Sequence, residues 1–70
     1  MNERIAMTVE EAAEYTGIGR NTLRQLIRWE AMPVLYVSRK KLIRTDVLDE
    51  FLLANQNADL RDKDAVRPVS

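Results

Sequence analysis

The alternation of apolar and polar positions predicts a chain of short helices joined by tight turns. Between residues 9 and 16, apolar and small side chains recur at helical spacing, which predicts a first helix with one narrow buried stripe. Thr8 and Glu11 have the spacing of a capping box at its start. Gly17 suits the left-handed position after this helix, and Gly19 suits the N-cap of the next one.

The second predicted helix, within residues 19–30, is the most strongly amphipathic stretch of the sequence. At roughly 100° per residue, its apolar positions fall on one face and its long polar side chains within about 140° of the other. The apolar face comprises Thr22, Leu23, Leu26 and Ile27, and the polar face comprises Arg20, Asn21, Arg24, Gln25 and Arg28. A short glycine-containing turn between two such helices, with Ile18 at the corner, is what a helix-turn-helix requires.

After Pro33, which ends the second helix, two short runs predict a β-hairpin. The strands are expected at residues 34–37 and 41–44, with a polar turn at 38–40. We expect the hairpin to pack on the helices through Leu35, Val37 and Ile43, because an isolated hairpin is only marginally stable. The register stays open, and one possible pairing places Leu42 opposite Tyr36 on the outer face.

A third helix is predicted to about Ala54. Thr45 is its expected N-cap, and Asp46 suits the positive end of the helix dipole. Val47, Leu48, Phe51 and Leu52 form its expected buried stripe.

These elements predict an α+β fold, a small winged helix-turn-helix with the order helix, helix, strand, strand, helix. Residues 8–54 are the predicted domain. Residues 1–7 are a lead-in from which Ile5 and Met7 pack on the domain. Residues 55–70 lose all periodicity and are predicted to be a flexible tail.

Composition narrows the range of functions. The 70 residues are enough for one small domain. The chain has no cysteine and no histidine, so a disulfide framework, a thiolate zinc site and histidine-based catalysis are excluded. We therefore expect no enzyme activity, catalytic residue, cofactor, metal site or small-molecule ligand. No apolar run is long enough for a signal peptide or membrane span, so we expect a cytoplasmic protein without a membrane partner.

The charge is neutral overall but strongly segregated. Residues 20–44 contain seven basic side chains and one acid, a net charge of +6, whereas the rest of the chain carries −6. Such a block presents a defined basic face to a polyanion. Arg, Asn and Gln are also the side chains that bond to base edges in the DNA major groove.

The expected partner is therefore double-stranded DNA. The predicted recognition helix supplies Arg20, Asn21, Arg24, Gln25 and Arg28, the predicted wing supplies Arg39, Lys40 and Lys41, and Thr8, Thr22 and Arg44 are candidate phosphate contacts. Two plainer interpretations remain open. In the first, the second helix is an amphipathic surface helix whose arginines are simply solvated. In the second, the basic residues of the hairpin protect an exposed strand edge against aggregation.

The sequence also resembles the excisionase family of small winged-helix DNA-binding domains, which is related in fold to the DNA-binding head of the MerR regulators. The resemblance covers roughly residues 7–54 and lies in the runs TVEEAAEYTGIGRNTLRQLIR, MP, VSRKK and IRTDVLDEFL. It departs from the family at Gly19, where many members have Ser or Thr, and at Glu30-Ala31, where glycine is frequent. The wing tip also lacks a glycine.

The resemblance implies an excisionase of a mobile element, a recombination directionality factor that binds and bends the element's ends for a tyrosine integrase. A second hypothesis is a small winged-helix transcriptional regulator, although no coiled-coil helix follows residue 54 for MerR-like dimerisation. A third, from another class, is an adaptor whose arginines bind an acidic protein.

Because Leu60 and Val66 are isolated apolar residues, the tail is expected to contact the integrase or another copy of the chain on DNA. A dispensable tail is the alternative.

Overall fold

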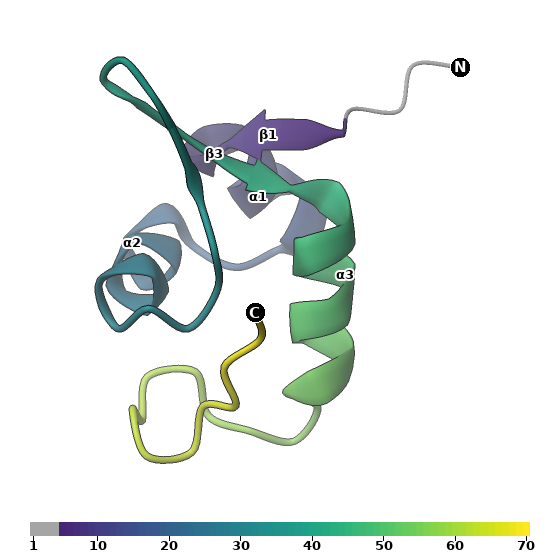
Figure 1. The fold of residues 1–70 in the computed structure, drawn as a ribbon. Helices are drawn as coiled ribbons and strands as arrows, with labels where there is room; N and C mark the ends of the chain where they lie inside the picture. Colours follow the sequence, from purple (N-terminus) through teal and green to yellow (C-terminus); the bar gives the residue numbers. More distant parts are fainter. Residues whose placement is uncertain (1–4) are drawn as a thin grey trace.

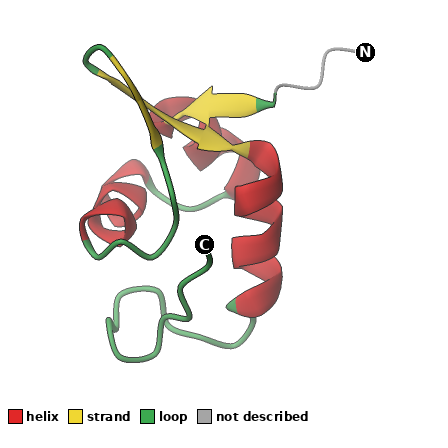
Figure 2. Cartoon of the chain, viewed as in Figure 1, coloured by secondary structure: helices red, strands yellow, loops and turns green. Residues whose placement is uncertain are grey.

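The computed structural model describes residues 5–70 as a small α+β winged helix-turn-helix with three helices and a three-stranded sheet, which confirms the predicted fold class (Figures 1 and 2). The order differs from the prediction by one additional strand at the start. The elements are β1 (Ala6–Thr8), α1 (Val9–Thr16), α2 (Arg20–Arg28), β2 (Leu35–Val37), β3 (Lys40–Arg44) and α3 (Thr45–Ala54).

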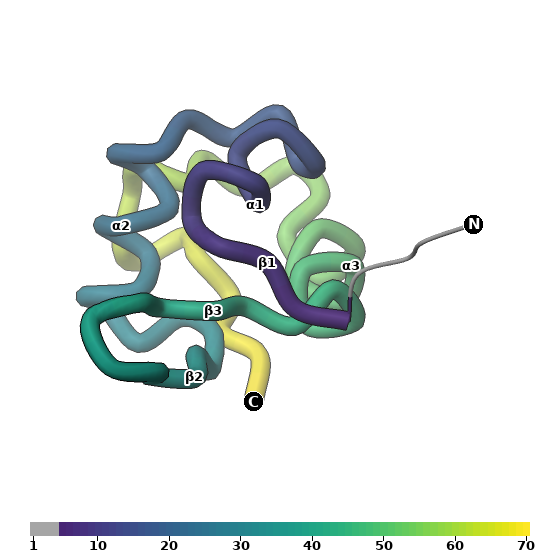
Figure 3. Tube along the Cα trace, turned by 90° about the horizontal axis from the view of Figure 1, so that it is seen from above, coloured from purple at the N-terminus to yellow at the C-terminus, as the bar shows by residue number. Residues whose placement is uncertain are grey.

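Strand β1 is the largest correction to the predicted lead-in. The sheet is antiparallel with the order β1-β3-β2, and Met7 of β1 pairs with Ile43 of β3 (Figure 3). Met7 is buried as expected, but Ile5 is 75% exposed, so its predicted packing is wrong. Three residues are too few for a recognisable alternation, and pairing with a strand more than thirty residues later stabilises them. Residues 1–4 of the predicted lead-in lie outside the described residues.

The turn between α1 and α2 forms as its two glycines predicted. Thr8 Oγ1 accepts a hydrogen bond from the Glu11 backbone N–H, and the Glu11 carboxylate accepts one from the Thr8 N–H, which completes the capping box. Gly17 has a φ of +79°, and its N–H donates to the Ala13 carbonyl at the end of α1. Gly19 is the N-cap of α2 in extended geometry. Because α1 ends here, α2 can cross it closely.

Helix α2 ends in a Schellman motif built without glycine. The Glu30 N–H donates to the Ile27 carbonyl, and the Ala31 N–H donates to the Leu26 carbonyl, both at 2.9 Å. This pattern requires a left-handed residue, and Glu30 occupies it with a φ of +58°. The departure from glycine at this position therefore costs backbone strain without changing the turn.

The hairpin forms with a register that the sequence left open, and its packing differs from the prediction. A two-residue turn, Ser38-Arg39, joins β2 to β3, so that Leu42 pairs with Leu35, and Tyr36 pairs with Lys41. Ile43 is fully buried as predicted. The other two predicted anchors are wrong, since Leu35 is 49% exposed and Val37 is 51% exposed. Strand β2 is the outer strand of a hairpin that extends beyond the helices, so neither of its faces is covered (Figure 1).

Helix α3 begins one position earlier than predicted. Arg44 is the N-cap, and Thr45 is the first helical residue, whose N–H is already engaged with the Ile5 carbonyl across the sheet. Of the predicted buried stripe, Val47, Leu48 and Phe51 are buried, whereas Leu52 is 37% exposed.

Residues 55–70 follow a different course from the flexible tail expected from the sequence. They fold back across the helices, and the Val69 N–H donates to the Ala31 carbonyl at 2.9 Å. The buried Asn55 side chain hydrogen-bonds both the N–H and the carbonyl of Arg67. Val66 joins the hydrophobic core. Short turns rather than a helix or strand make up this segment, so periodicity cannot detect it.

The core lies between the sheet and the three helices. Its fully buried large side chains are Leu23, Leu26, Ile43, Leu48 and Phe51. None of the helices in the described part of the chain is long and apolar enough to cross a membrane.

Candidate nucleic-acid interface

Helix α2 presents a polar face to solvent because its apolar face is held in the core. Leu23, Leu26 and Ile27 are buried. The five predicted recognition residues occupy the other side: Arg20, Asn21 and Arg28 are exposed, and Arg24 and Gln25 are partly exposed. The structure therefore brings all five onto one accessible helix face, as the spacing predicted.

Arg24 lies at the edge of this face, where α2 meets the start of α1. Its guanidinium Nη2 is 3.1 Å from the Glu10 carboxylate. Both side chains are substantially exposed, at 41% and 57%, so water screens the pair and it contributes little to stability. Arg24 is thus positioned by a weak ion pair that a phosphate or a base edge can replace.

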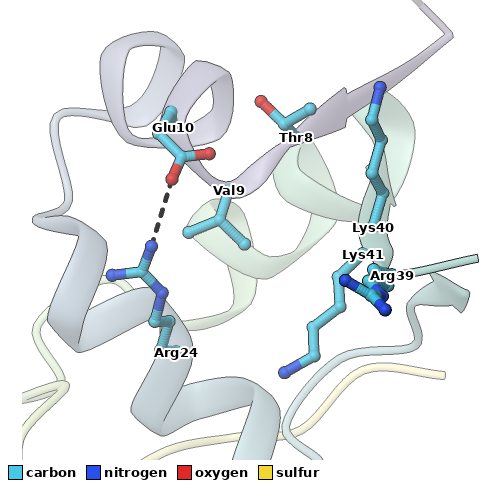
Figure 4. A pocket seen from close by; sticks show the side chains of 7 residues that line it. All are labelled: Thr8, Val9, Glu10, Arg24, Arg39, Lys40 and Lys41. Carbon is cyan, nitrogen blue, oxygen red and sulfur yellow. Dashed lines mark hydrogen bonds and ion pairs between the residues drawn. The ribbon is translucent and has the colours of Figure 1, made fainter.

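The wing is the hairpin formed by β2 and β3, and it lies across a groove from Arg24. Three parts of the chain line this basic groove (Figure 4). Its floor consists of Thr8, Val9 and Glu10, one side is formed by Arg24, and the other side is formed by Arg39, Lys40 and Lys41. Its volume is about 350 Å³. Lys41 points toward the α2 side of the groove, whereas Lys40 points the opposite way (Figure 4). Two elements that are distant in sequence therefore place cations around one depression.

The basic groove opens at the N-terminus of α1, but the capping box already engages two backbone donors there. Thr8 Oγ1 accepts one of these N–H groups, and the Glu11 carboxylate accepts the other. The Thr8 hydroxyl proton keeps the capacity to donate to a phosphate oxygen. Of the three candidate phosphate contacts, Thr8 alone lines the basic groove.

Arg44 stands apart from the basic groove. It lies at the end of β3 away from the hairpin turn, and its guanidinium donates two 2.9 Å hydrogen bonds to the Asp46 carboxylate. Hydrogen bonding to Arg44 lowers the pKa of Asp46 below its ordinary value of 3.8, and the pKa of Arg44 is raised in return. The charge of Arg44 is therefore locally balanced. Thr22, the third candidate, lies on the opposite flank of α2 beside Trp29 and Leu60.

The remaining polar residues of α2 interact along the helix. Arg28 Nη2 donates to Gln25 Oε1, and Arg24 Nη1 donates to Asn21 Oδ1 at 3.4 Å. All four side chains keep free donors, since a guanidinium has five N–H groups and a side-chain amide has two. The face can therefore offer bidentate hydrogen bonding to a base edge without breaking a buried contact.

Two side chains near this surface were missed in the sequence. Glu10 was not among the predicted site residues, and its place in the basic groove depends on how α1 crosses α2. Arg61 was assigned to the tail, yet it lies beside Asn21 and Gln25. Neither position carries a local signal, because both contacts join residues that are far apart in the chain.

A cluster of at least three acidic side chains suited to a metal ion does not occur within residues 5–70.

A family model described as a helix-turn-helix domain matches residues 6–56, and the chain therefore belongs to this helix-turn-helix family. The comparisons with curated proteins and with solved structures gave no match. Helix-turn-helix domains are typical of sequence-specific DNA binding, with the second helix placed in the major groove.

Proposed function

We propose that the chain is a DNA-binding excisionase that binds and bends the ends of a mobile element and promotes excision by a tyrosine integrase. The observation that carries the DNA-binding part is the basic groove, where the α2 face and the wing place cations on one side of the molecule. The charge of +6 between residues 20 and 44 of a neutral chain also favours a polyanionic partner.

In this proposal, α2 lies in the major groove and reads base edges through Arg24, Asn21 and Gln25. The wing residues Arg39, Lys40 and Lys41 hold phosphates or enter the neighbouring minor groove. Contacts at two neighbouring grooves favour DNA that curves toward the protein, because bending lets both elements bind at once. Such a bend brings distant integrase sites closer together without any catalytic group on this chain.

The excision role rests on the resemblance of residues 7–54 to excisionases and on the course of the tail. After α3 the chain turns back to Ala31 through Val69, where a MerR-like regulator would continue into a dimerisation helix. This course of the chain after α3 favours an accessory factor over a regulator of that kind.

The test is an excision assay with the tyrosine integrase that the proposal requires and a plasmid carrying both ends of the proposed element. Wild-type protein is expected to raise excision strongly over integrase alone, and Arg24→Ala is expected to abolish the increase. Glu50→Ala is the matched control, because Glu50 is exposed on α3 and makes no part of the basic groove. Binding to the element's ends without any effect on excision would refute the excisionase role and favour a transcriptional regulator.

A further inference from the structure

The flank of α2 opposite the wing carries a second groove. Asn21, Thr22, Gln25 and Trp29 line it from α2, and Leu60 and Arg61 line it from the C-terminal segment. Its volume is about 380 Å³. Asn21 and Gln25 also belong to the predicted recognition face, so this groove is continuous with the proposed DNA-binding surface.

The turn that carries Arg61 is held against the domain. Asp59 Oδ1 accepts from the Arg61 N–H at 3.0 Å, and the Asp59 carbonyl accepts from the Asp62 N–H at 3.0 Å. Leu60 packs against the hydrophobic core. Further along, Asn55 binds the backbone of Arg67, so the segment is fixed on both sides of the turn. Figures 1 and 3 both show this segment passing beside α2.

Arg61 is the cation of this segment that is both near α2 and available. Its side chain is 85% exposed, and its ion pair with Asp59 spans 3.8 Å. The Arg67 guanidinium, by contrast, donates to the Ala54 carbonyl at 3.0 Å. Lys63 is exposed but does not line the groove.

We propose that Arg61 forms a second phosphate clamp, which holds the DNA strand on the flank of α2 opposite the wing. An α-helix with its side chains is about as wide as the major groove, roughly 10–12 Å, so a helix in that groove has a phosphate backbone on each side. The wing faces one of these strands, and the turn at Arg61 faces the other. This inference rests on the proposed DNA binding and extends it to the C-terminal segment.

The acidic neighbours limit the size of the effect. The carboxylate of Asp59 is bound to the Arg61 N–H, and that of Asp62 is bound to the Asp64 N–H. Both are acidic side chains beside the proposed path of the DNA, and they reduce the gain from Arg61. A single exposed phosphate contact in this setting is expected to change affinity by about three- to tenfold and the salt slope by about one unit.

The experiment compares Arg61→Ala with Lys63→Ala in the full chain, by fluorescence anisotropy on a bound duplex and on a scrambled one. Both variants remove one exposed cation from the same segment, so they change the net charge equally. Arg61→Ala should weaken binding to both duplexes by about three- to tenfold and lower the salt slope by about one, whereas Lys63→Ala should change affinity by less than about twofold. Thermal unfolding of each variant confirms that the fold is kept, and Arg61→Lys should restore most of the lost affinity.

The outcomes separate this inference from the proposed function. Equal affinities of Arg61→Ala and Lys63→Ala, on DNA that the wild-type chain binds tightly, would overturn the clamp and leave DNA binding by α2 and the wing intact. Failure of the wild-type chain to bind any duplex would overturn both.

Discussion

Replacing Asn55 by alanine tests whether the C-terminal segment is an integral part of the fold. The Asn55 side chain makes three hydrogen bonds: Nδ2 donates to the Phe51 and Arg67 carbonyls at 2.9 Å, and Oδ1 accepts from the Arg67 N–H at 2.7 Å. Asn55 is only 6% exposed, so water cannot replace these bonds unless the segment moves away.

The expected loss follows from the usual net value of such bonds. At about 0.5–1.5 kcal/mol for each bond, Asn55→Ala should lower the free energy of unfolding by about 2–4 kcal/mol. A chain of this length is expected to have a total stability of only about 4–10 kcal/mol. Since about 1 kcal/mol corresponds to 4–8 °C in a domain of this size, Tm should fall by roughly 8–30 °C.

Thermal and urea unfolding, followed by circular dichroism, measure this loss. Gln56→Ala is the matched control, because Gln56 is the exposed neighbour of Asn55, and it should change Tm by no more than about 3 °C. Asn55→Asp keeps the acceptor for Arg67 but loses both donated bonds at neutral pH, and it should also be destabilising. An unchanged Tm for Asn55→Ala would refute the docked segment and restore the flexible tail expected from the sequence.

Three further substitutions test the interface and the turn after α2. Glu10→Gln removes the acid from the basic groove and releases Arg24, so affinity for every duplex should rise by about two- to fivefold in anisotropy titrations; unchanged or weaker binding would count against Glu10 as a competitor of phosphate. Glu30→Gly relieves the left-handed residue of the Schellman motif and should raise the free energy of unfolding by about 1 kcal/mol, whereas a lower Tm would show that Glu30 is not strained. Arg44→Ala should weaken DNA binding less than Lys41→Ala, because Asp46 already engages Arg44, and a larger loss for Arg44→Ala would place the duplex near the start of α3.

Local sequence patterns were sufficient wherever neighbouring residues determine the structure. The capping box of Thr8 and Glu11, the left-handed Gly17 and the two faces of α2 depend on residues within one or two helical turns, and all three were predicted. The same holds for the position of the recognition residues on one face.

Long-range contacts account for what was missed. Strand β1 exists because it pairs with β3, and the C-terminal segment is docked because Asn55 and Val66 find partners elsewhere in the chain. The register of the hairpin depends on the two-residue turn at Ser38, where a φ of +58° would ordinarily indicate glycine. The residue pattern after Pro33 predicted the hairpin as an element but left its register open.

Direct readout by α2 together with phosphate binding by the wing is the central claim, and a single titration series tests it. Wild-type, Arg24→Ala and Lys41→Ala proteins are titrated by fluorescence anisotropy against a duplex from the end of the element and a scrambled duplex, at several salt concentrations. If about half of the eight side chains of α2 and the wing meet phosphates, the salt slope should lie at roughly −3 to −5.

Arg24→Ala should lose about 1–3 kcal/mol on the specific duplex and much less on the scrambled one, whereas Lys41→Ala should weaken both alike and lower the slope by about one. Equal losses of Arg24→Ala on both duplexes would contradict direct readout by α2. Binding that is absent near physiological salt would contradict DNA recognition altogether and favour an adaptor that binds an acidic protein.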